Sequence, residues 1–207
     1  MFINFWYAAL RSDQLADQPV KVRMLGQNFV LFRDTAGQAR CLSNVCVHRG
    51  GSLAGGKVKG DGVECPYHGW QFDGAGLCTR IPSLGSAAKL PARARVDAYP
   101  VEERYGLVHV FLGDLPEAER PTIMSIPEYG QPGWHAQLDE YLDTADYRRT
   151  IENGLDPAHN EFVHTTHGFS GKEGDSRVPD LTIEESPWGC GFMTTYYSWR
   201  YVFAGEV

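Results

Sequence analysis

Hydrophobic residues in the first half of the chain fall in short runs, as they do in β-strands. Residues 20–24 alternate between hydrophobic and polar, 29–32, 39–42 and 105–112 predict further strands, and the apolar residues 1–10 predict a buried opening strand or turn. Turn-forming pairs such as Asp61–Gly62 and Asp73–Gly74 interrupt them, and glycine is dense between Gly50 and Gly76. We therefore expect an all-β first half whose glycine-rich loops wrap tightly around a bound group.

The second half has a different pattern. Prolines recur between residues 113 and 133, which predicts a connector and a domain boundary near residues 115–120. Residues 141–164 mix helical and irregular signals, and 193–203 alternate like a strand with an aromatic face. No closing helix or polar tail follows that strand, so we expect a fragment or a truncated form of a longer protein.

Composition and charge exclude several classes of protein. Hydrophobic residues make up 43% and charged residues 22% of 207, as in ordinary soluble proteins. The net charge of −7, from 19 basic and 26 acidic residues with no long basic run, argues against nucleic acid and is compatible with docking a positively charged face of another protein. No apolar run approaches the roughly 20 residues of a membrane span, and no signal peptide is apparent. An odd number of cysteines, five, favours a reducing cytoplasm over a disulfide framework.

Two short motifs carry metal-ligating side chains. Cys46 and His48 form C-x-H, and Cys65 and His68 form C-x-x-H. Two thiolates and two imidazoles can hold zinc or iron. Because each loop supplies one sulfur and one nitrogen, the two loops together can hold a pair of irons, with the thiolates on one and the imidazoles on the other. Zinc, or two unrelated loops, are the alternatives.

The residues around these ligands favour a pair of irons over zinc or two unrelated loops. Segments 46–51 (CVHRGG) and 65–70 (CPYHGW) resemble the two ligand loops of Rieske proteins. The resemblance implies a [2Fe–2S] cluster. Respiratory Rieske proteins carry an extra cysteine in each loop, where this chain has Gly51 and Tyr67, and a serine where it has Trp70. The chain is thus similar to ring-hydroxylating oxygenases and their ferredoxins, which implies a potential toward the lower end of the roughly −150 to +300 mV Rieske range.

A second motif follows the first. Asp156, His159 and His164 form D-x-x-H-x-x-x-x-H, which resembles the catalytic signature of Rieske non-heme iron oxygenase α subunits. The resemblance implies that His159 and His164 bind a mononuclear Fe(II) in a 2-His-1-carboxylate triad. It also implies that Asp156 hydrogen-bonds His159 and, across a subunit interface, a neighbour's Rieske histidine, His68 here. Asn153 would lie near the iron. A helix N-cap is the alternative role for Asp156.

The third ligand expected from the family is a carboxylate far downstream, which the chain does not reach. Only 43 residues follow His164, and Asp175 and Asp180 lie in a stretch punctuated by Gly and Pro, so neither is assigned. The resemblance implies an α+β fold. An all-β Rieske [2Fe–2S] domain would span 1–118, and the N-terminal part of a helix-grip (START-like) α+β catalytic domain would span 119–207.

The resemblance also implies a function. The chain would be the terminal oxygenase component, which takes electrons from NAD(P)H through a reductase, sometimes with a ferredoxin, and activates O₂. It would hydroxylate, dihydroxylate or demethylate a small organic substrate, aromatic or cyclic, as a homotrimer in the cytoplasm. The alternative is a Rieske ferredoxin-like electron carrier with a non-catalytic C-terminal extension. The sequence does not predict the identity of the substrate.

Overall fold

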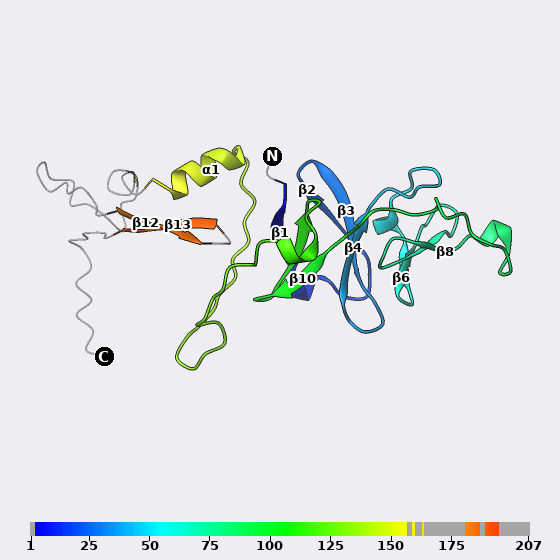
Figure 1. Ribbon diagram of the computed structural model, residues 1–207, viewed down its shortest axis with the longest axis horizontal. Coiled ribbons are helices and arrows are strands. Elements are labelled where there is room, and N and C mark those ends of the chain that lie inside the picture. Colours follow the sequence, from blue (N-terminus) through cyan, green and yellow to red (C-terminus); the bar gives the residue numbers. More distant parts are fainter. Residues whose placement is uncertain (1–2, 157–158, 160–162, 164–180, 187–188, 195–207) are drawn as a thin grey trace, which may run out of the picture. The chain divides into compact units, whose positions relative to one another are not determined.

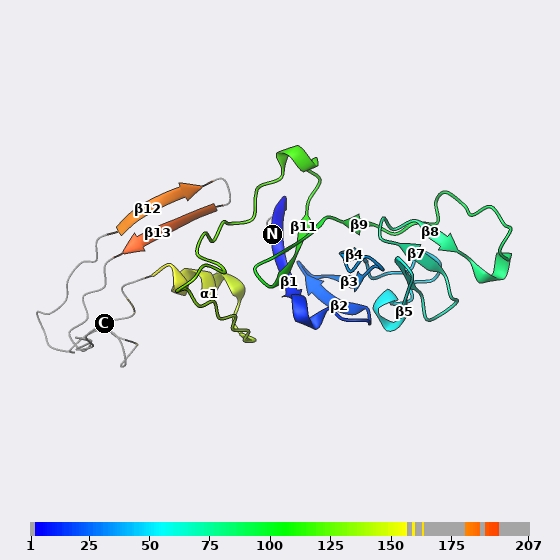
Figure 2. The same cartoon turned by 90° about the horizontal axis from the view of Figure 1, so that it is seen from below.

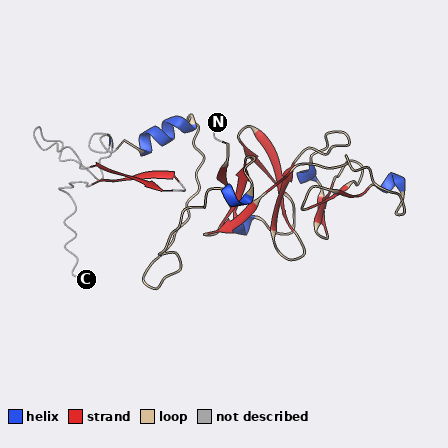
Figure 3. Ribbon diagram, in the orientation of Figure 1, coloured by secondary structure: helices blue, strands red, loops and turns tan. Residues whose placement is uncertain are grey.

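The computed structural model describes residues 3–156, 159, 163, 181–186 and 189–194. The chain divides into two compact units, Met1–Ile123 and Met124–Val207, which are described separately. Strands dominate the first unit, as predicted (Figure 3). Within residues 3–123 the helical segments are short 3₁₀ turns: η1 (Ser12–Gln14), η2 (Leu53–Gly55), η3 (Pro82–Leu84) and η4 (Glu117–Glu119).

Two antiparallel sheets form the base of the first unit (Figure 1). In one, the strand order is β2 (Val20–Met24), β3 (Gln27–Arg33), β4 (Ala39–Ser43) and β9 (Ala98–Tyr99). In the other, it is β1 (Phe5–Arg11), β11 (Leu107–Leu112) and β10 (Val101–Arg104). The strands predicted at 20–24, 29–32 and 39–42 are confirmed. The strand predicted at 105–112 begins two residues later, because Tyr105 and Gly106 have φ of +56° and +76° and form the turn before it.

Strand β3 connects the two hydrophobic cores of this unit. Its residues alternate between them, since side chains of a strand point to opposite faces. Val30 and Phe32 belong to the inner core, which also contains Cys46 and Cys65. Phe29 and Leu31 pack in the outer core, against β11. A strand that is buried on both faces fixes the position of the neighbouring β4, whose end leads into the first metal-ligating motif.

Residues 44–96 form what we call the small lobe, at the end of this unit opposite β1 (Figures 1 and 2). Its antiparallel sheet has the order β5 (Lys57–Lys59), β6 (Gly62–Glu64), β7 (Gln71–Asp73) and β8 (Cys78–Arg80). The second metal-ligating motif lies between β6 and β7, so both motifs are held by strand ends. Cys41, Cys46, Cys65 and Cys78 form no disulfide.

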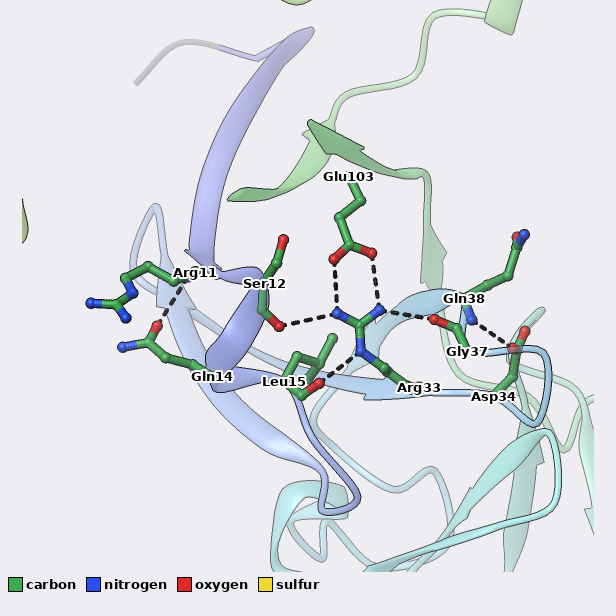
Figure 4. A network of polar contacts seen from close by, with 9 residues as sticks. All are labelled: Arg11, Ser12, Gln14, Leu15, Arg33, Asp34, Gly37, Gln38 and Glu103. Carbon is green, nitrogen blue, oxygen red and sulfur yellow. Dashed lines mark hydrogen bonds and ion pairs between the residues drawn. The ribbon is translucent and has the colours of Figure 1, made fainter. Parts of the chain in front are cut away.

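A single arginine joins three segments of the base (Figure 4). Arg33 of β3 donates from Nε to the Leu15 carbonyl at 2.7 Å and from its terminal nitrogens to the carbonyls of Ser12 and Gly37 at 3.0 and 2.8 Å. It also forms a bidentate pair with Glu103 of β10, at 2.8 and 2.9 Å. Because all these bonds come from one rigid guanidinium, Arg33 fixes the η1 turn against both sheets.

The second unit contains helix α1 (Tyr147–Gly154) and a hairpin of β12 (Leu181–Ser186) and β13 (Gly189–Thr194). The Asp146 carboxylate caps α1 by accepting the Arg148 N–H at 3.0 Å. The strand predicted at 193–203 overlaps β13 by two residues, and its remainder lies outside the described residues. The assignment of this unit to a helix-grip catalytic domain stays a prediction. None of the described helices is long and apolar enough to cross a membrane.

Candidate metal centre

The two motifs lie in loops that share one backbone frame. In each loop the cysteine N–H donates to the carbonyl five residues ahead, and the N–H four residues ahead donates to the cysteine carbonyl, at distances of 2.8 to 3.0 Å. The residues joined are Cys46 with Gly51 and Gly50, and Cys65 with Trp70 and Gly69. The histidine stands two residues after the cysteine in the first loop and three after it in the second. The frames match, but the ligand positions in them differ.

Glycines allow this backbone conformation in each loop and allow the two loops to lie close together. Gly50 and Gly69, at the same place in the two loops, have φ of +73° and +69°, which glycine adopts at no steric cost. Gly51 serves a different purpose. A Cβ added there would lie 3.0 Å from the Sγ of Cys65 and 3.4 Å from the Cβ of Tyr67. The absence of a side chain at Gly51 therefore lets the second loop approach the first.

The two thiols are buried beside each other at the margin of the inner core. Cys46 and Cys65 are 3% and 2% exposed. Burial raises the pKa of the Cys46 thiol to about 11, and the neighbouring Cys65 thiol adds to this effect. The backbone N–H groups of His48 and Arg49, which bond to the Cys46 sulfur, act in the opposite direction. The Cys46 thiol is held as a thiolate at neutral pH only when a cation beside it offsets the cost of burial.

The two imidazoles lie together as well. The ring centroids of His48 and His68 are 4.5 Å apart with planes at 67°. The Nδ1 of His48 is buried and has no hydrogen-bond partner among the described residues. Burial, with smaller contributions from His68 and Arg49, lowers the pKa of His48, which favours the neutral ring. A buried ring nitrogen with an unused lone pair has the chemistry of a metal ligand.

The surroundings of the two rings differ. The indole of Trp70 stacks on His48 with centroids 4.5 Å apart and planes at 4°. Trp70 in turn packs against the inner core, where its ring centroid is 6.5 Å from that of Phe72. His68 is exposed, and Tyr67 beside it is 62% exposed. The indole thus covers a face of His48, whereas His68 stays exposed although the tilted Tyr67 ring lies 4.0 Å from it.

The donor set fits a dinuclear cluster better than a single metal ion. Within the part of the chain that the structure describes, no three His, Cys, Asp or Glu side chains converge on one point. A structural zinc ion needs four ligands around one centre. In a Rieske cluster each iron takes only two protein ligands. Two buried sulfurs in one pair and two imidazoles in another, with an unpartnered ring nitrogen, fit that requirement.

The second motif is only partly within the described residues. Asn153 lies in the last turn of α1 and accepts the Asp156 N–H on its carbonyl oxygen at 3.3 Å. The Nδ1 of His159 is 2.5 Å from the backbone carbonyl oxygen of Asp156. An Nδ1–H that donates there leaves Nε2 of His159 as the nitrogen available to a metal. His164 lies outside the described residues, as do Asp175 and Asp180, so this iron site stays a prediction.

Sequence reasoning missed one residue that holds the first loop. Asn44 is 4% exposed, and its Nδ2 donates to the Ser52 hydroxyl at 2.9 Å. Its Oδ1 accepts the Ala54 N–H at 2.8 Å. These bonds tie together the two ends of the first loop. The only signal in the sequence is the general tendency of asparagine to bond to nearby backbone in turns.

Comparison with known proteins agrees with this geometry. Residues 5–100 match the family of the Rieske [2Fe-2S] domain. The chain carries a Rieske [2Fe–2S] domain. The match covers β1, the sheet of β2, β3, β4 and β9, and both ligand loops, so the predicted all-β first half and its cofactor are confirmed.

Similarity continues beyond the Rieske domain. The chain is 38% identical over 193 residues to cholesterol 7-desaturase nvd 1 of Ciona intestinalis, a match over 91% of this chain and 38% of the relative. It is 32% identical over 210 residues to the phenoxybenzoate dioxygenase subunit alpha of Ectopseudomonas oleovorans, over 95% and 50%. Among solved structures, NdmA of Pseudomonas putida CBB5 matches with a TM-score of 0.80 and 26% identity, over 94% of this chain and 59% of that one.

These matches confirm the resemblance to Rieske-type oxygenase subunits. The chain spans about half, or less, of the length of the curated relatives it matches.

Proposed function

We propose that this chain is the N-terminal part of the terminal oxygenase component of a Rieske non-heme iron system. The observation that carries the proposal is the pair of loops that bring Cys46, Cys65, His48 and His68 together beside a buried core. These four residues would hold the [2Fe–2S] cluster, which supplies one-electron transfer when bound. NAD(P)H would be the electron source, through a reductase and, in some systems, a ferredoxin.

The protein residues around the cluster have separate tasks in this proposal. Cys46 and Cys65 would hold one iron in a pocket from which the inner core excludes water. His48, through its buried Nδ1, and His68 would hold the other. The backbone N–H groups that point at the Cys46 sulfur would stabilise negative charge there. The exposed ring of His68 would be the place where electrons leave the cluster toward the iron of a neighbouring subunit.

The second iron site would be completed outside this chain. His159 and His164 would supply two ligands, and a downstream carboxylate would supply the third. The Asp156 carboxylate would hydrogen-bond His159 and, across a subunit interface, the His68 of a neighbour. Asn153 would lie near that iron. O₂ and a small organic substrate, aromatic or cyclic, would meet there and give a hydroxylated, dihydroxylated or demethylated product. We further infer a homotrimer in the cytoplasm, since the electron path would cross a subunit interface.

The first experiment tests the cluster. The purified chain should contain two irons and two acid-labile sulfides, and after reduction it should show the EPR signal of a Rieske centre. Cys46→Ser should abolish both, whereas Cys41→Ser, at a buried cysteine outside the loops, should leave both in place. A colourless protein that binds zinc at these side chains would refute the proposal.

The second experiment separates an oxygenase from an electron carrier. In the full-length protein, His159→Ala should stop product formation and coupled O₂ uptake while the EPR signal of the cluster is retained. His135→Ala, at an exposed histidine outside both motifs, is the control and should change neither. Unchanged product formation in the His159 variant would contradict the oxygenase assignment and favour a ferredoxin-like carrier.

A further inference from the structure

Residues 113–123, which we call the strap, lead from the end of β11 to the end of the first unit. The prolines of this segment predict a connector, but the structure attaches it to the sheet of β1, β11 and β10. The η4 turn in its middle is exposed, whereas four residues on either side of that turn are partly buried: Leu115, Arg120, Pro121 and Ile123. The strap is therefore held at both of its ends.

The strap lies on the face of this sheet that points away from the outer core. Val108 and Val110 of β11 pack in that core, so Phe111, which follows them in the alternation, faces the other way. Phe111 is nevertheless only 1% exposed. The indole of Trp6 covers its ring at a centroid distance of 5.4 Å, and the guanidinium carbon of Arg120 lies 5.3 Å from the ring centroid. The strap thus contributes a side chain to the cover of a buried aromatic ring.

Asn4 holds the first end of the strap. Its Oδ1 accepts the N–H groups of Asp114 and Leu115 at 2.9 and 3.3 Å, and its own N–H donates to the Leu112 carbonyl at 2.7 Å. The fit is close, because a Cβ at Gly113 would lie 2.6 Å from the Cα of Asn4. The φ of Asn4 is +66°, which asparagine tolerates better than most residues. A residue before the first strand thus caps the segment that leaves the last one.

Two side chains from the outer strands of the sheet hold the second end. The Nε1–H of Trp6 on β1 donates to the Pro121 carbonyl at 2.7 Å, and Arg104 of β10 donates to the Ile123 carbonyl at 3.2 Å. Because β11 lies between β1 and β10 in the sheet, the strap crosses β11 between these two bonds. The rings of Pro116 and Pro121 fix φ at two of its positions, which makes the strap stiffer.

We propose that the strap fixes the point at which the chain leaves the Rieske domain, and that Asn4 and Trp6 are positioning residues for electron transfer from the cluster to the mononuclear iron. This inference rests on the proposed function, in which the two cofactors belong to different units of the chain. One electron would pass from the reduced cluster to Fe(III), which becomes Fe(II), and no bond would form or break. A released strap of eleven residues could extend by up to about 36–40 Å, so its attachment restricts the separation of the two metals.

Asn4→Gly/Trp6→Phe is the test variant. Glycine adopts the positive φ of Asn4 without strain and keeps the backbone bond to Leu112, but it removes the Oδ1 acceptor. Phenylalanine keeps an aromatic ring against Phe111 and removes the N–H that bonds to the strap. Val22→Ala is the control, because Val22 packs against the outer core from β2 and makes none of the bonds that hold the strap. Both variants should lower the melting temperature.

Hydrogen exchange of the backbone amides, read by mass spectrometry over residues 113–123, tests the attachment in this chain. Exchange there should become about fivefold faster in the double variant, because three hydrogen bonds to the strap are lost. In Val22→Ala it should keep the wild-type rate. Unchanged exchange in the double variant would mean that Asn4 and Trp6 do not hold the strap, and the inference would fail.

The full-length enzyme tests the positioning role. Its mononuclear iron is oxidised to Fe(III), a flash-generated deazaflavin radical reduces the cluster by one electron, and visible absorbance follows the return of the oxidised cluster. Loss of the ferric EPR signal identifies the acceptor. Because a displacement of about 1 Å can cost a factor of about 100 in a positioned reaction, the double variant should lower the rate constant at least about tenfold. Val22→Ala should leave the rate constant unchanged.

The outcomes separate this inference from the proposed function. A wild-type rate constant in the double variant, together with faster exchange in its strap, would overturn the positioning role. An equal decrease in Val22→Ala would do the same, since the effect would then follow from general destabilisation. A wild-type enzyme that lacks the cluster spectrum, or that passes no electron to the ferric iron, would refute the proposed function and with it this role of Asn4 and Trp6.

Discussion

The stack of Trp70 on His48 leads to a prediction about the reduction potential. Replacing Trp70 with Leu removes an electron-rich ring whose plane lies at 4° to the imidazole of a proposed cluster ligand. A π face stabilises positive charge on the ring beneath it and so favours the oxidised cluster over the reduced one. The indole also keeps water from that side of the ligand, and water would stabilise the additional negative charge of the reduced state. Both effects are lost in the variant, so its potential should rise.

The size of the effect follows from the geometry. At a centroid distance of 4.5 Å the two rings are in direct contact, and Trp70 is half-buried. A partly exposed contact between a cation and a π face is worth about 0.5–1 kcal/mol. For a one-electron couple, in which about 59 mV corresponds to a factor of ten, this energy corresponds to a rise of about 20–45 mV. Trp70→Phe keeps a smaller ring on the imidazole and should raise the potential by less.

Protein-film voltammetry of the purified chain measures these potentials directly. Tyr67→Leu is the matched control, because Tyr67 lies against the other imidazole, His68, but is tilted by 37° and largely exposed. Its removal should shift the potential by less than the removal of Trp70. An unchanged or lowered potential in Trp70→Leu, with the cluster spectrum intact, would refute the role assigned to the stack.

Two further predictions concern the loops and the base. Gly51→Ala places a Cβ 3.0 Å from the Sγ of Cys65 and should cost about 1–3 kcal/mol of overpacking, seen as less bound iron per chain. Gly55→Ala, whose Cβ meets its nearest neighbour at 3.7 Å, should retain full iron content, and equal losses in both would contradict this reasoning. The Arg33 guanidinium lowers the pKa of Glu103, so this pair stabilises the fold fully above the ordinary carboxyl pKa of about 4.3 and less as pH falls through the lowered folded value. Urea unfolding at neutral and acid pH should therefore show a smaller acid loss of stability in Glu103→Gln, and identical pH profiles would rule out the effect.

The parts of the fold that the sequence predicted are those governed by local pattern. Alternation located β2, short runs between turn signals located β3 and β4, and the residue types at the two loops identified the cluster ligands proposed here. The turn at Tyr105 was missed because positive φ at a residue other than glycine has no signature in composition. The Trp70 stack could not be predicted, since it joins two loops through tertiary contact. The hairpin at β12 was also missed, because its strand pattern lies beside a stretch dominated by Gly and Pro.

The net charge of the whole chain likewise differs from the net charges of its separate segments. The net value of −7 suggested a partner with a positive face. Because this value adds a strongly acidic second unit to a basic small lobe, it describes neither of them. Grouping the charges by the segments that fold together gives a small lobe of +4 within a chain of −7.

The unequal surroundings of the two histidines have a consequence for the order of events. His48 lies beneath an indole and is partly exposed, whereas His68 is exposed. In the proposed homotrimer a neighbouring subunit would occupy the exposed edge of His68, so an electron would enter the cluster elsewhere and leave through this imidazole. Assembly would therefore have to precede turnover, and a chain diluted until the homotrimer dissociates should accept electrons without passing them on.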